Sequence, residues 1–236
     1  MTDRYTALDL ETTGLDPKTD RILEIGAVFV ENGREAGSFS RLVNPRREIT
    51  EKVTELTGIT GQMVENCPDI SQILPEFLEL CGDSPILGHN ILFDFRFLKR
   101  AALNCGLTFE RSGIDTLALC RKFMPAGEKK NLQAACRHFQ VETERAHRAL
   151  DDARAAHRLY QKLALNCGME DVDAFSPKPL EYKIKREQPA SKRQKELLRD
   201  LLKYHKITLS AQMDDLSRNE IARITDKIIS KYGRIL

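Results

Sequence analysis

The chain reads Tyr5-Thr6-Ala7-Leu8-Asp9-Leu10-Glu11-Thr12-Thr13-Gly14-Leu15 near its start, a short apolar run that contains two acidic residues. As a β-strand it places Asp9 and Glu11 on one face and the two central leucines on the other, because successive side chains point to opposite sides. Two carboxylates held in one small volume raise each other's pKa unless a cation lies between them. We therefore expect this strand to carry half of a site for a divalent cation.

The composition is that of an ordinary globular protein, with 236 residues of which 41% are hydrophobic and 31% are charged. No window approaches the length of a membrane span, and the first residues lack the basic start and apolar run of a secretory signal. We therefore expect a cytoplasmic protein that does not bind membranes. Its six cysteines are scattered without the close pairs of a metal site, and we expect reduced core residues.

Charge is distributed unevenly along the chain. From Lys178 onward there are 15 Lys or Arg residues and 8 Asp or Glu residues, whereas the part before it has 22 and 27, so that the tail carries +7 and the body −5. An acidic body suits a site that collects cations. A basic tail suits a polyanion, although solvated lysines on a helix would explain the same balance.

The order of expected elements begins with three strands in a meander. Segment 21–30 is rich in β-branched residues, and Asn32-Gly33 is a strong hairpin signal before a third strand at 38–43. Helical segments follow between residues 50 and 81, and a short buried strand at 85–90 leads into the next helix. The later predicted helices are 91–104, 115–123, 131–139 and 148–165.

Two of these helices carry an acidic residue on the face that should be buried. Asp94 shares a stripe with apolar residues three, four and seven positions later, and Asp152 repeats this anomaly. Its neighbour Asp151 instead shares a face with basic residues and is predicted to lie at the surface. A buried lone carboxylate is unfavourable, so Asp94 and Asp152 each need a cation or several donors.

The end of the chain is predicted to be a separate small module. Residues 169–190 contain three prolines among charged residues and are expected to be a linker after a domain at 1–168. Ser191 and Ser217 each begin a capping box, and we expect a basic module of two or three helices at 191–236.

These anomalies together point to metal chemistry. Four carboxylates, from Asp9, Glu11, Asp94 and Asp152, would bind two divalent cations about 3.5–4 Å apart if they converge, and Mg²⁺ or Mn²⁺ suits such oxygen ligands. His147 lies five residues before Asp152, and imidazole is well matched to accepting a proton from water near neutral pH.

Three stretches carry a family resemblance, namely Asp9-Leu10-Glu11-Thr12-Thr13-Gly14, Gly88-His89-Asn90-Ile91-Leu92-Phe93-Asp94 and His147-Arg148-Ala149-Leu150-Asp151-Asp152-Ala153. They resemble the three exonuclease motifs of the DEDDh (DnaQ-like) superfamily, over about residues 4–165. Within it, the chain is most similar to the proofreading exonucleases of bacterial replicative polymerases, the polymerase III epsilon subunit and PolC-type group. The resemblance implies an α/β, RNase H-like fold with a mixed sheet flanked by helices. It also implies removal of nucleoside 5′-monophosphates from a single-stranded 3′ end by a two-metal mechanism.

The same resemblance implies roles for individual residues. Asp9 would bridge both metal ions, and Glu11 and Asp152 would complete one metal shell. Asp94 would support the other ion, and His147 would activate the attacking water. Leu15 would act as a wedge beside the terminal base, and backbone amides near Thr12 would bind the terminal nucleotide. The residues implied in substrate binding are Thr12, Thr13, Gly14, Leu15, His89, Asn90 and Phe93.

Several alternatives stay open from the sequence. DNA, in proofreading or repair, is the favoured substrate, but an RNA-trimming 3′→5′ exoribonuclease would share the metal residues. A non-catalytic scaffold that binds nucleic acid is the alternative from another functional class. Such a scaffold is expected to have lost a metal ligand, and none of the expected ligands is missing from this sequence. The tail, which the resemblance does not reach, would bind either nucleic acid or a DNA polymerase or another replication or repair protein.

Overall fold

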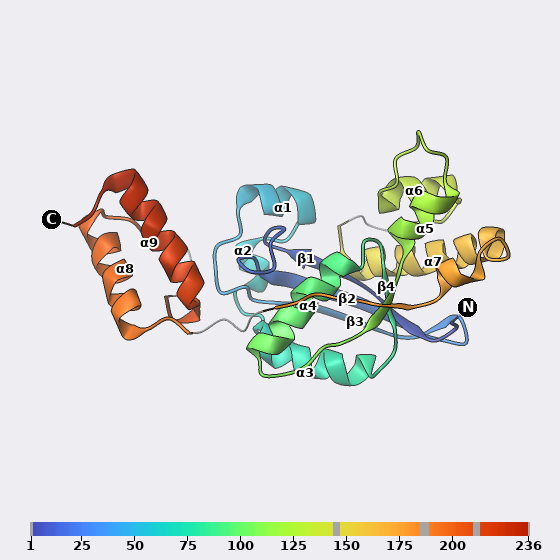
Figure 1. The fold of residues 1–236 in the computed structure, drawn as a ribbon, viewed down its shortest axis with the longest axis horizontal. Coiled ribbons are helices and arrows are strands. Elements are labelled where there is room, and N and C mark those ends of the chain that lie inside the picture. Colours follow the sequence, from blue (N-terminus) through green and yellow to red (C-terminus); the bar gives the residue numbers. More distant parts are fainter. Residues whose placement is uncertain (1, 144–146, 185–188, 210–212, 236) are drawn as a thin grey trace. The chain divides into compact units, whose positions relative to one another are not determined.

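The structure is a computed structural model that describes residues 2–143, 147–184, 189–209 and 213–235 (Figure 1). It divides into two compact units. The first comprises Met1–Pro45 and Ile49–Lys183, and the second comprises Arg46–Glu48 and Ile184–Leu236.

The first unit is built on a six-stranded mixed sheet with the order β3-β2-β1-β4-β5-β6. β1 pairs antiparallel with β2 and parallel with β4, β4 pairs parallel with β5, and β6 closes the far edge antiparallel to β5. Asn32 and Gly33 have φ values of 51° and 70°, as expected for the turn of the β2–β3 hairpin. The strands are β1 (Tyr5–Thr12), β2 (Ile22–Glu31), β3 (Arg34–Leu42), β4 (Ile86–Gly88), β5 (Ser112–Asp115) and β6 (Lys178–Pro179).

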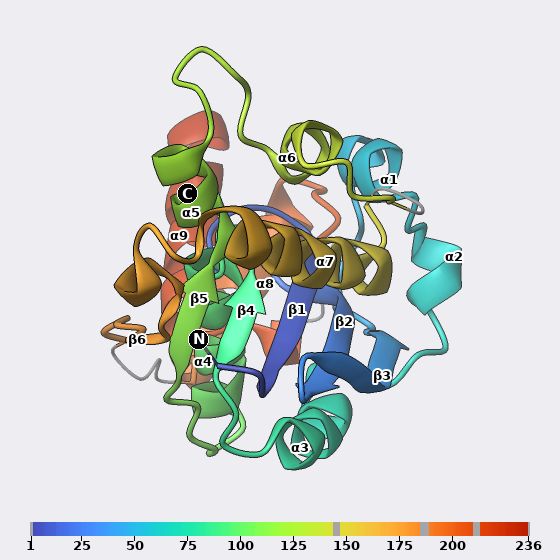
Figure 2. The same cartoon turned by 90° about the vertical axis from the view of Figure 1, so that its right-hand side faces the viewer.

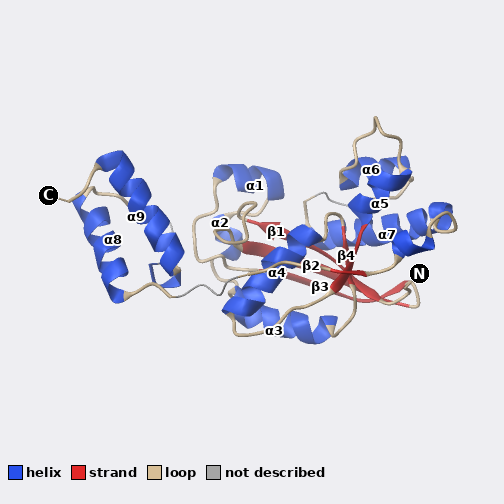
Figure 3. Cartoon of the chain, in the orientation of Figure 1, coloured by secondary structure: helices blue, strands red, loops and turns tan. Residues whose placement is uncertain are grey.

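Helices cover both faces of this sheet (Figures 2 and 3). Side chains of β1 alternate between two cores, so that Tyr5 and Ala7 pack with α7 while Leu8 and Leu10 pack with α3 and α4. The expected mixed sheet flanked by helices is therefore confirmed. The helices of this unit are α1 (Glu51–Thr57), α2 (Gly61–Val64), α3 (Ile70–Cys81), α4 (Leu92–Asn104), α5 (Thr116–Phe123), α6 (Leu132–His138) and α7 (Ala149–Cys167).

The prediction of a linker from residue 169 is wrong for its first part. A 3₁₀ turn, η1 (Val172–Phe175), buries Phe175 fully, and its ring centroid lies 5.6 Å from that of Phe123 and 6.0 Å from that of Tyr160. β6 then adds a strand to the sheet, where Pro179 is tolerated because an edge strand has little need of its missing N–H. The first unit thus continues to Lys183.

The second unit contains the helical module expected from the tail. Ser191 and Ser217 both form the predicted capping boxes, at the starts of α8 (Lys192–Tyr204) and α9 (Arg218–Tyr232), with a short 3₁₀ turn η2 (Met213–Asp215) between them. Leu198, Leu201 and Leu216 pack with the isoleucines of α9 in a small core. All six cysteines of the chain are free thiols. In the part of the chain that the structure describes, no helix has the length and apolarity needed to cross a membrane.

Candidate active site

The carboxylates of β1 lie on the face of the sheet that α7 covers. Asp9 is opposite Gly26 in the register with β2, and Glu11 is opposite Glu24. Glu11 is buried, at 8% exposure, and part of Asp9 stays accessible. The expectation that both acids share one face of a strand is therefore met.

Asp94 joins this edge from the first turn of α4. Its side chain is 3% exposed, and its Oδ1 accepts a hydrogen bond from the backbone N–H of Leu10 at 3.0 Å. Leu10 lies between Asp9 and Glu11, so this bond ties the start of α4 to the acidic end of β1. Asp94 is thus the buried acid that its helical position predicted.

Asp152 and His147 come from the start of α7. The backbone N–H of His147 donates to Oδ2 of Asp152 at 2.9 Å, and His147 adopts a φ of 61°. One possible ligand atom from each of Glu11, His147 and Asp152 lies within 4.8 Å of the others. Asp152 is buried at 9% exposure while Asp151 is only half-buried, which agrees with their predicted faces.

A glycine on β2 allows α7 to approach the sheet closely. A Cβ atom on Gly26 would lie 2.1 Å from the backbone carbon of Ala149 and from the backbone nitrogen of Leu150, a distance that backbone atoms cannot accommodate. Because Asp9 faces Gly26 across the strands, the start of α7 lies directly beside the acidic edge.

Glu24 fixes the start of α7 in this place. Its carboxylate accepts from Nη2 of Arg148 at 2.8 Å, from Nε of Arg148 at 3.2 Å and from the backbone N–H of Ala149 at 3.2 Å. The Glu24 side chain is 1% exposed. Arg148 is the N-cap residue of α7, but its side chain makes no capping hydrogen bond to the helix. Glu24 on β2 instead supplies the acceptor for the helix N-terminus.

Sequence reasoning missed Glu24. The available signal was the same as for Asp9 and Glu11, an acidic residue within an apolar strand, and Glu24 becomes fully buried. We refer to Glu24 with Arg148 as the α7 clamp.

We call Asp9, Glu11, Asp94 and Asp152 the acidic cluster. Burial and mutual repulsion raise the pKa of each of these four acids. The pKa of Asp9 lies well above its usual value, first because of burial and then because of Asp94, Glu11 and Asp152. Burial, followed by the charges of Asp152 and Glu24, raises the pKa of Glu11 to about 8.

The two helical acids behave in the same way. Burial raises the pKa of Asp94 well above its usual value, against backbone hydrogen bonds that lower it. Burial also raises the pKa of Asp152, partly offset by the N–H of His147. Protein groups alone therefore do not stabilise the ionised cluster.

The cluster fits divalent cations. The carboxylates of Asp9 and Glu11 receive no hydrogen bond from any residue that the structure describes, so their oxygens are available as ligands. Carboxylate oxygens are the ligands that Mg²⁺ and Mn²⁺ prefer, and two positive ions would remove the repulsion that raises these pKa values. Asp9, Glu11, Asp94 and Asp152 are the residues that would hold them.

The segment after β1 contains the predicted substrate-binding residues. The Thr12 hydroxyl donates to the carbonyl of Gly14 at 2.7 Å, and the Thr13 hydroxyl accepts from the N–H of Arg21 at 2.9 Å. A Cβ on Gly14 would lie 2.5 Å from the carboxylate of Asp20, so this glycine makes room for the chain's own side chain. Leu15 is 84% exposed, as a residue that contacts a ligand from solvent would be.

The second predicted group lies between β4 and α4. The two ring nitrogens of His89 are engaged by the Thr116 hydroxyl at 3.0 Å and the Lys130 carbonyl at 2.7 Å, and burial lowers its pKa. Asn90, at a φ of 74°, donates its backbone N–H to Asp115, and the Phe93 ring is half-buried. His89 is thus held by protein partners and orders the loop beside Asp94.

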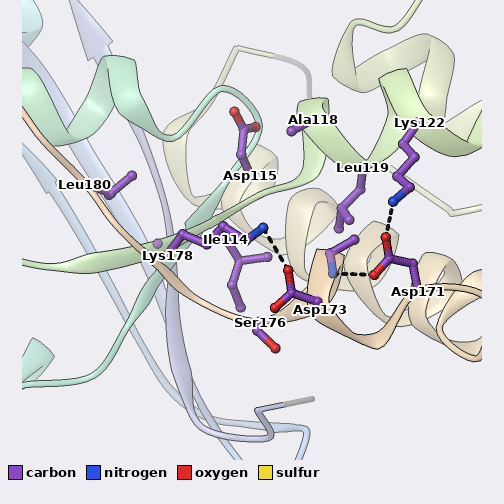
Figure 4. Close-up of a pocket in the computed structure, with 12 residues that line it drawn as sticks. Ile114, Asp115, Ala118, Leu119, Lys122, Asp171, Asp173, Ser176, Lys178 and Leu180 are labelled. Carbon is purple, nitrogen blue, oxygen red and sulfur yellow. Dashed lines mark hydrogen bonds and ion pairs between the residues drawn. The ribbon is translucent and has the colours of Figure 1, made fainter.

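Acidic residues also line a separate cavity of about 310 Å³ between β5, α5, η1 and β6 (Figure 4). There Asp171 pairs with Lys122, and Asp173 pairs with Lys178. Lysines neutralise Asp171 and Asp173, and the third acid of the lining, Asp115, accepts the backbone N–H groups of Asn90 and Leu117. Among the described residues, every carboxylate of this cavity therefore has a partner, unlike those of Asp9 and Glu11.

Comparisons with known proteins agree with this geometry. The exonuclease family model (RNase_T) matches residues 6–160, a range that includes every acid of the cluster and His147. The chain is 38% identical over 181 residues to the DNA polymerase III PolC-type of Clostridium perfringens, which covers 77% of this chain and 12% of that protein. It is 36% identical over 160 residues to the DNA polymerase III epsilon subunit of Aquifex aeolicus, which covers 67% of this chain and 79% of the relative. The chain thus spans only about an eighth of the PolC-type relative.

Solved structures show the same fold. Exonuclease X in complex with 5′-overhanging duplex DNA has a TM-score of 0.58 and 28% identity, over 70% of this chain and 93% of that one. Escherichia coli exonuclease I in complex with a dT13 oligonucleotide has a TM-score of 0.63 over 73% of this chain and 43% of that one; at 19% identity it supports the fold alone. The resemblance expected from the three motifs is confirmed. The chain belongs to the exonuclease family.

Proposed function

We propose that the protein is a metal-dependent 3′→5′ exonuclease that releases nucleoside 5′-monophosphates from single-stranded DNA ends. The observation that carries this proposal is the convergence of Asp9, Glu11, Asp94 and Asp152, with His147, at one edge of the sheet. DNA is favoured over RNA because the relatives are named as parts of DNA polymerase III and exonuclease X was solved with DNA.

The roles in this proposal are those that the family resemblance implies, and the positions of the acidic side chains and of His147 support them. Asp9, Glu11, Asp94 and Asp152 would hold two ions, Mg²⁺ or Mn²⁺, which when bound would supply positive charge for the attacking and leaving oxygens of phosphodiester displacement. His147 is exposed, lies beside Glu11 and Asp152, and accepts the proton of the attacking water. The backbone of Thr12, Thr13 and Gly14 binds the terminal nucleotide, with Leu15 against its base. His89, Asn90 and Phe93 shape the other wall.

The test uses purified protein and 5′-labelled single-stranded DNA and RNA of the same sequence, with Mg²⁺, with Mn²⁺ and with chelator. A ladder that shortens from the 3′ end, together with mononucleotide release, is the expected result for DNA. Faster turnover of RNA would select the exoribonuclease, and binding without cleavage under every condition would select the scaffold.

Matched variants connect that result to the site. Asp152→Asn should lose cleavage, whereas Asp151→Asn, at the neighbouring half-buried position of α7, should retain it. Equal loss in both variants would contradict the proposed site.

The setting that we infer is DNA replication or repair in the cytoplasm, because the relatives include parts of DNA polymerase III. In this proposal the exonuclease domain is followed by the helical module, which binds either nucleic acid or a polymerase or another replication or repair protein. Co-purification of the full chain with a replicative polymerase subunit would support the second role.

A further inference from the structure

Two exposed tyrosines lie together at one end of the helical module. Tyr204, the last residue of α8, is 54% exposed, and Tyr232, the last residue of α9, is 50% exposed. The ring of His205 joins them, with its centroid 4.9 Å from that of Tyr204 and 5.6 Å from that of Tyr232. His205 also contacts the backbone carbonyl of Gly233 through Nε2 at 3.1 Å, which ties the ends of the two helices to each other.

The surroundings of these rings are strongly basic. Residues 200–209 and 226–235 together contain five Lys or Arg residues and two acidic residues, Asp200 and Asp226, which lie four and six residues before the tyrosines. Four of the basic residues are exposed at the ends of the two helices. They are Lys203, Lys206, Lys231 and Arg234. We call this group, with Tyr204, His205 and Tyr232, the aromatic–basic patch.

Helix electrostatics explain only part of this patch. Lysines in a last turn are favourable for the helix dipole, which accounts for Lys203 and Lys231. The same argument gives no reason for two tyrosine rings that stay half exposed, nor for Lys206 and Arg234 beyond the helix ends. Lys231 lies 5.0 Å from the centroid of the Tyr232 ring, so cation and aromatic surface are presented at one place.

We propose that the aromatic–basic patch binds single-stranded nucleic acid, with bases stacked on Tyr204 and Tyr232 and phosphates paired with the surrounding Lys and Arg side chains. Aromatic rings between basic side chains are the combination that single strands require, because every base offers a face for stacking and every linkage a negative charge. A protein partner would be expected to fit a more apolar and less uniformly charged surface.

This proposal deepens the proposed function, since the strand that the patch holds is the substrate of the catalytic unit on the same chain. The covalent link raises the local concentration of the strand, so that the two binding events reinforce each other. The patch and the acidic cluster nevertheless share no residue, which makes their failures separable.

The experiment measures binding of a fluorescent dT20 oligonucleotide to the full chain by anisotropy, in chelator so that no cleavage occurs, at several salt concentrations. Tyr204→Ala with Tyr232→Ala should weaken binding at least about tenfold, and Tyr204→Phe with Tyr232→Phe should restore it, because phenylalanine keeps the stacking surface. Thermal melting of each variant checks that the module stays folded.

Two double variants that each remove two positive charges, one within the patch and one outside it, locate the binding site on the module. Lys203→Gln with Lys231→Gln should lower the slope of log Kd against log salt by about 1.4, or about 0.7 for each phosphate that no longer has a lysine partner. Lys192→Gln with Arg193→Gln removes the same charge at the other end of α8 and should leave the slope nearly unchanged.

Two results would overturn the proposal. An unchanged Kd in the folded tyrosine-to-alanine variant would assign the patch to a protein partner, and equal slope changes in both charge variants would mean diffuse attraction without a site. If the natural chain bound the oligonucleotide through the patch but did not cleave DNA with Mg²⁺ or Mn²⁺, only the proposed function would be contradicted.

Discussion

His147 is the residue whose role the structure sharpens most, because its backbone and its side chain do different things. Its N–H holds Asp152, whereas its exposed ring is beside Glu11 and Asp152. His147→Gln keeps the backbone donor and all four acids, so we expect a fall in turnover of about 10²- to 10⁴-fold with cation binding retained. Single-turnover rates and the rise in Tm on adding Mn²⁺ measure the two effects. A rate within twofold of the natural chain would exclude His147 as the base.

Glu11 should make the stability of the cation-free protein depend on pH. Its pKa is about 8 in the folded state against an ordinary 4.5, so folding favours the protonated form. Its stabilising contribution is full below pH 4.5, falls as the pH rises to about 8 and is lost above that value. The shift corresponds to at most about 5 kcal/mol.

A comparison with Glu11→Gln isolates this effect from other titrating groups. Glutamine stays neutral, so in chelator the variant's Tm should exceed that of the natural chain by an amount that grows between pH 5 and pH 9. Adding Mg²⁺ should reverse the order, since only the natural chain has the full ligand set. A Tm difference that does not change with pH would contradict the raised pKa.

Sequence patterns predicted these site residues because each one breaks a local rule. Asp9 and Glu11 lie within an apolar strand, and two more acids lie on the apolar stripes of α4 and α7. These anomalies can be recognised from the sequence alone. Glu24 breaks the same rule but is satisfied by Arg148, which is 124 residues away, so that only the fold reveals its function.

At the scale of elements, the α7 clamp determines where the N-terminus of a long helix meets the sheet. Glu24→Gln should destabilise the fold by about 1.5–3 kcal/mol, since hydrogen bonds to a charged partner are weakened in a buried place. It should also lower turnover, because a displacement of about 1 Å of His147 and Asp152 can reduce the rate about 100-fold. Urea unfolding and single-turnover kinetics measure the two changes.

Glu35→Gln is the matched control, since Glu35 pairs with Arg154 at 3.0 Å and also joins α7 to the sheet. This pair is more exposed, so its loss should change stability by about 0–1 kcal/mol and leave turnover unchanged. If both variants had the same turnover, the α7 clamp would have no part in positioning the site.

The elements themselves were predictable where their signals are local. The β2–β3 hairpin follows from Asn32-Gly33, and both helices of the module follow from their capping boxes. β5 and β6 carry no such signal, because they have four and two residues and exist through pairing with distant partners. Short strands of this kind are determined by the sheet that they join.

For the molecule as a whole, the structure moves the end of the catalytic unit from residue 168 to residue 183. A chain that ends at 183 should therefore fold and melt cooperatively, whereas one that ends at 168 would lack Phe175, which fills a core between Phe123 and Tyr160. Removal of a fully buried phenylalanine destabilises a core by about 3–5 kcal/mol, and the shorter chain also exposes the edge of β5.

Phe175→Ala in the full chain separates the loss of packing from the loss of the edge strand. This variant should lower the free energy of unfolding by most of the 3–5 kcal/mol, at about the same magnitude as other buried Phe→Ala changes, while β6 remains paired with β5. Phe175→Leu should recover part of the lost stability. Urea unfolding of the chains 1–168 and 1–183, and of both variants, gives the comparison. Should 1–168 unfold at the same urea concentration as 1–183, residues 169–183 would be a linker after all, since a segment that adds a buried ring and a paired strand cannot be removed without loss of stability.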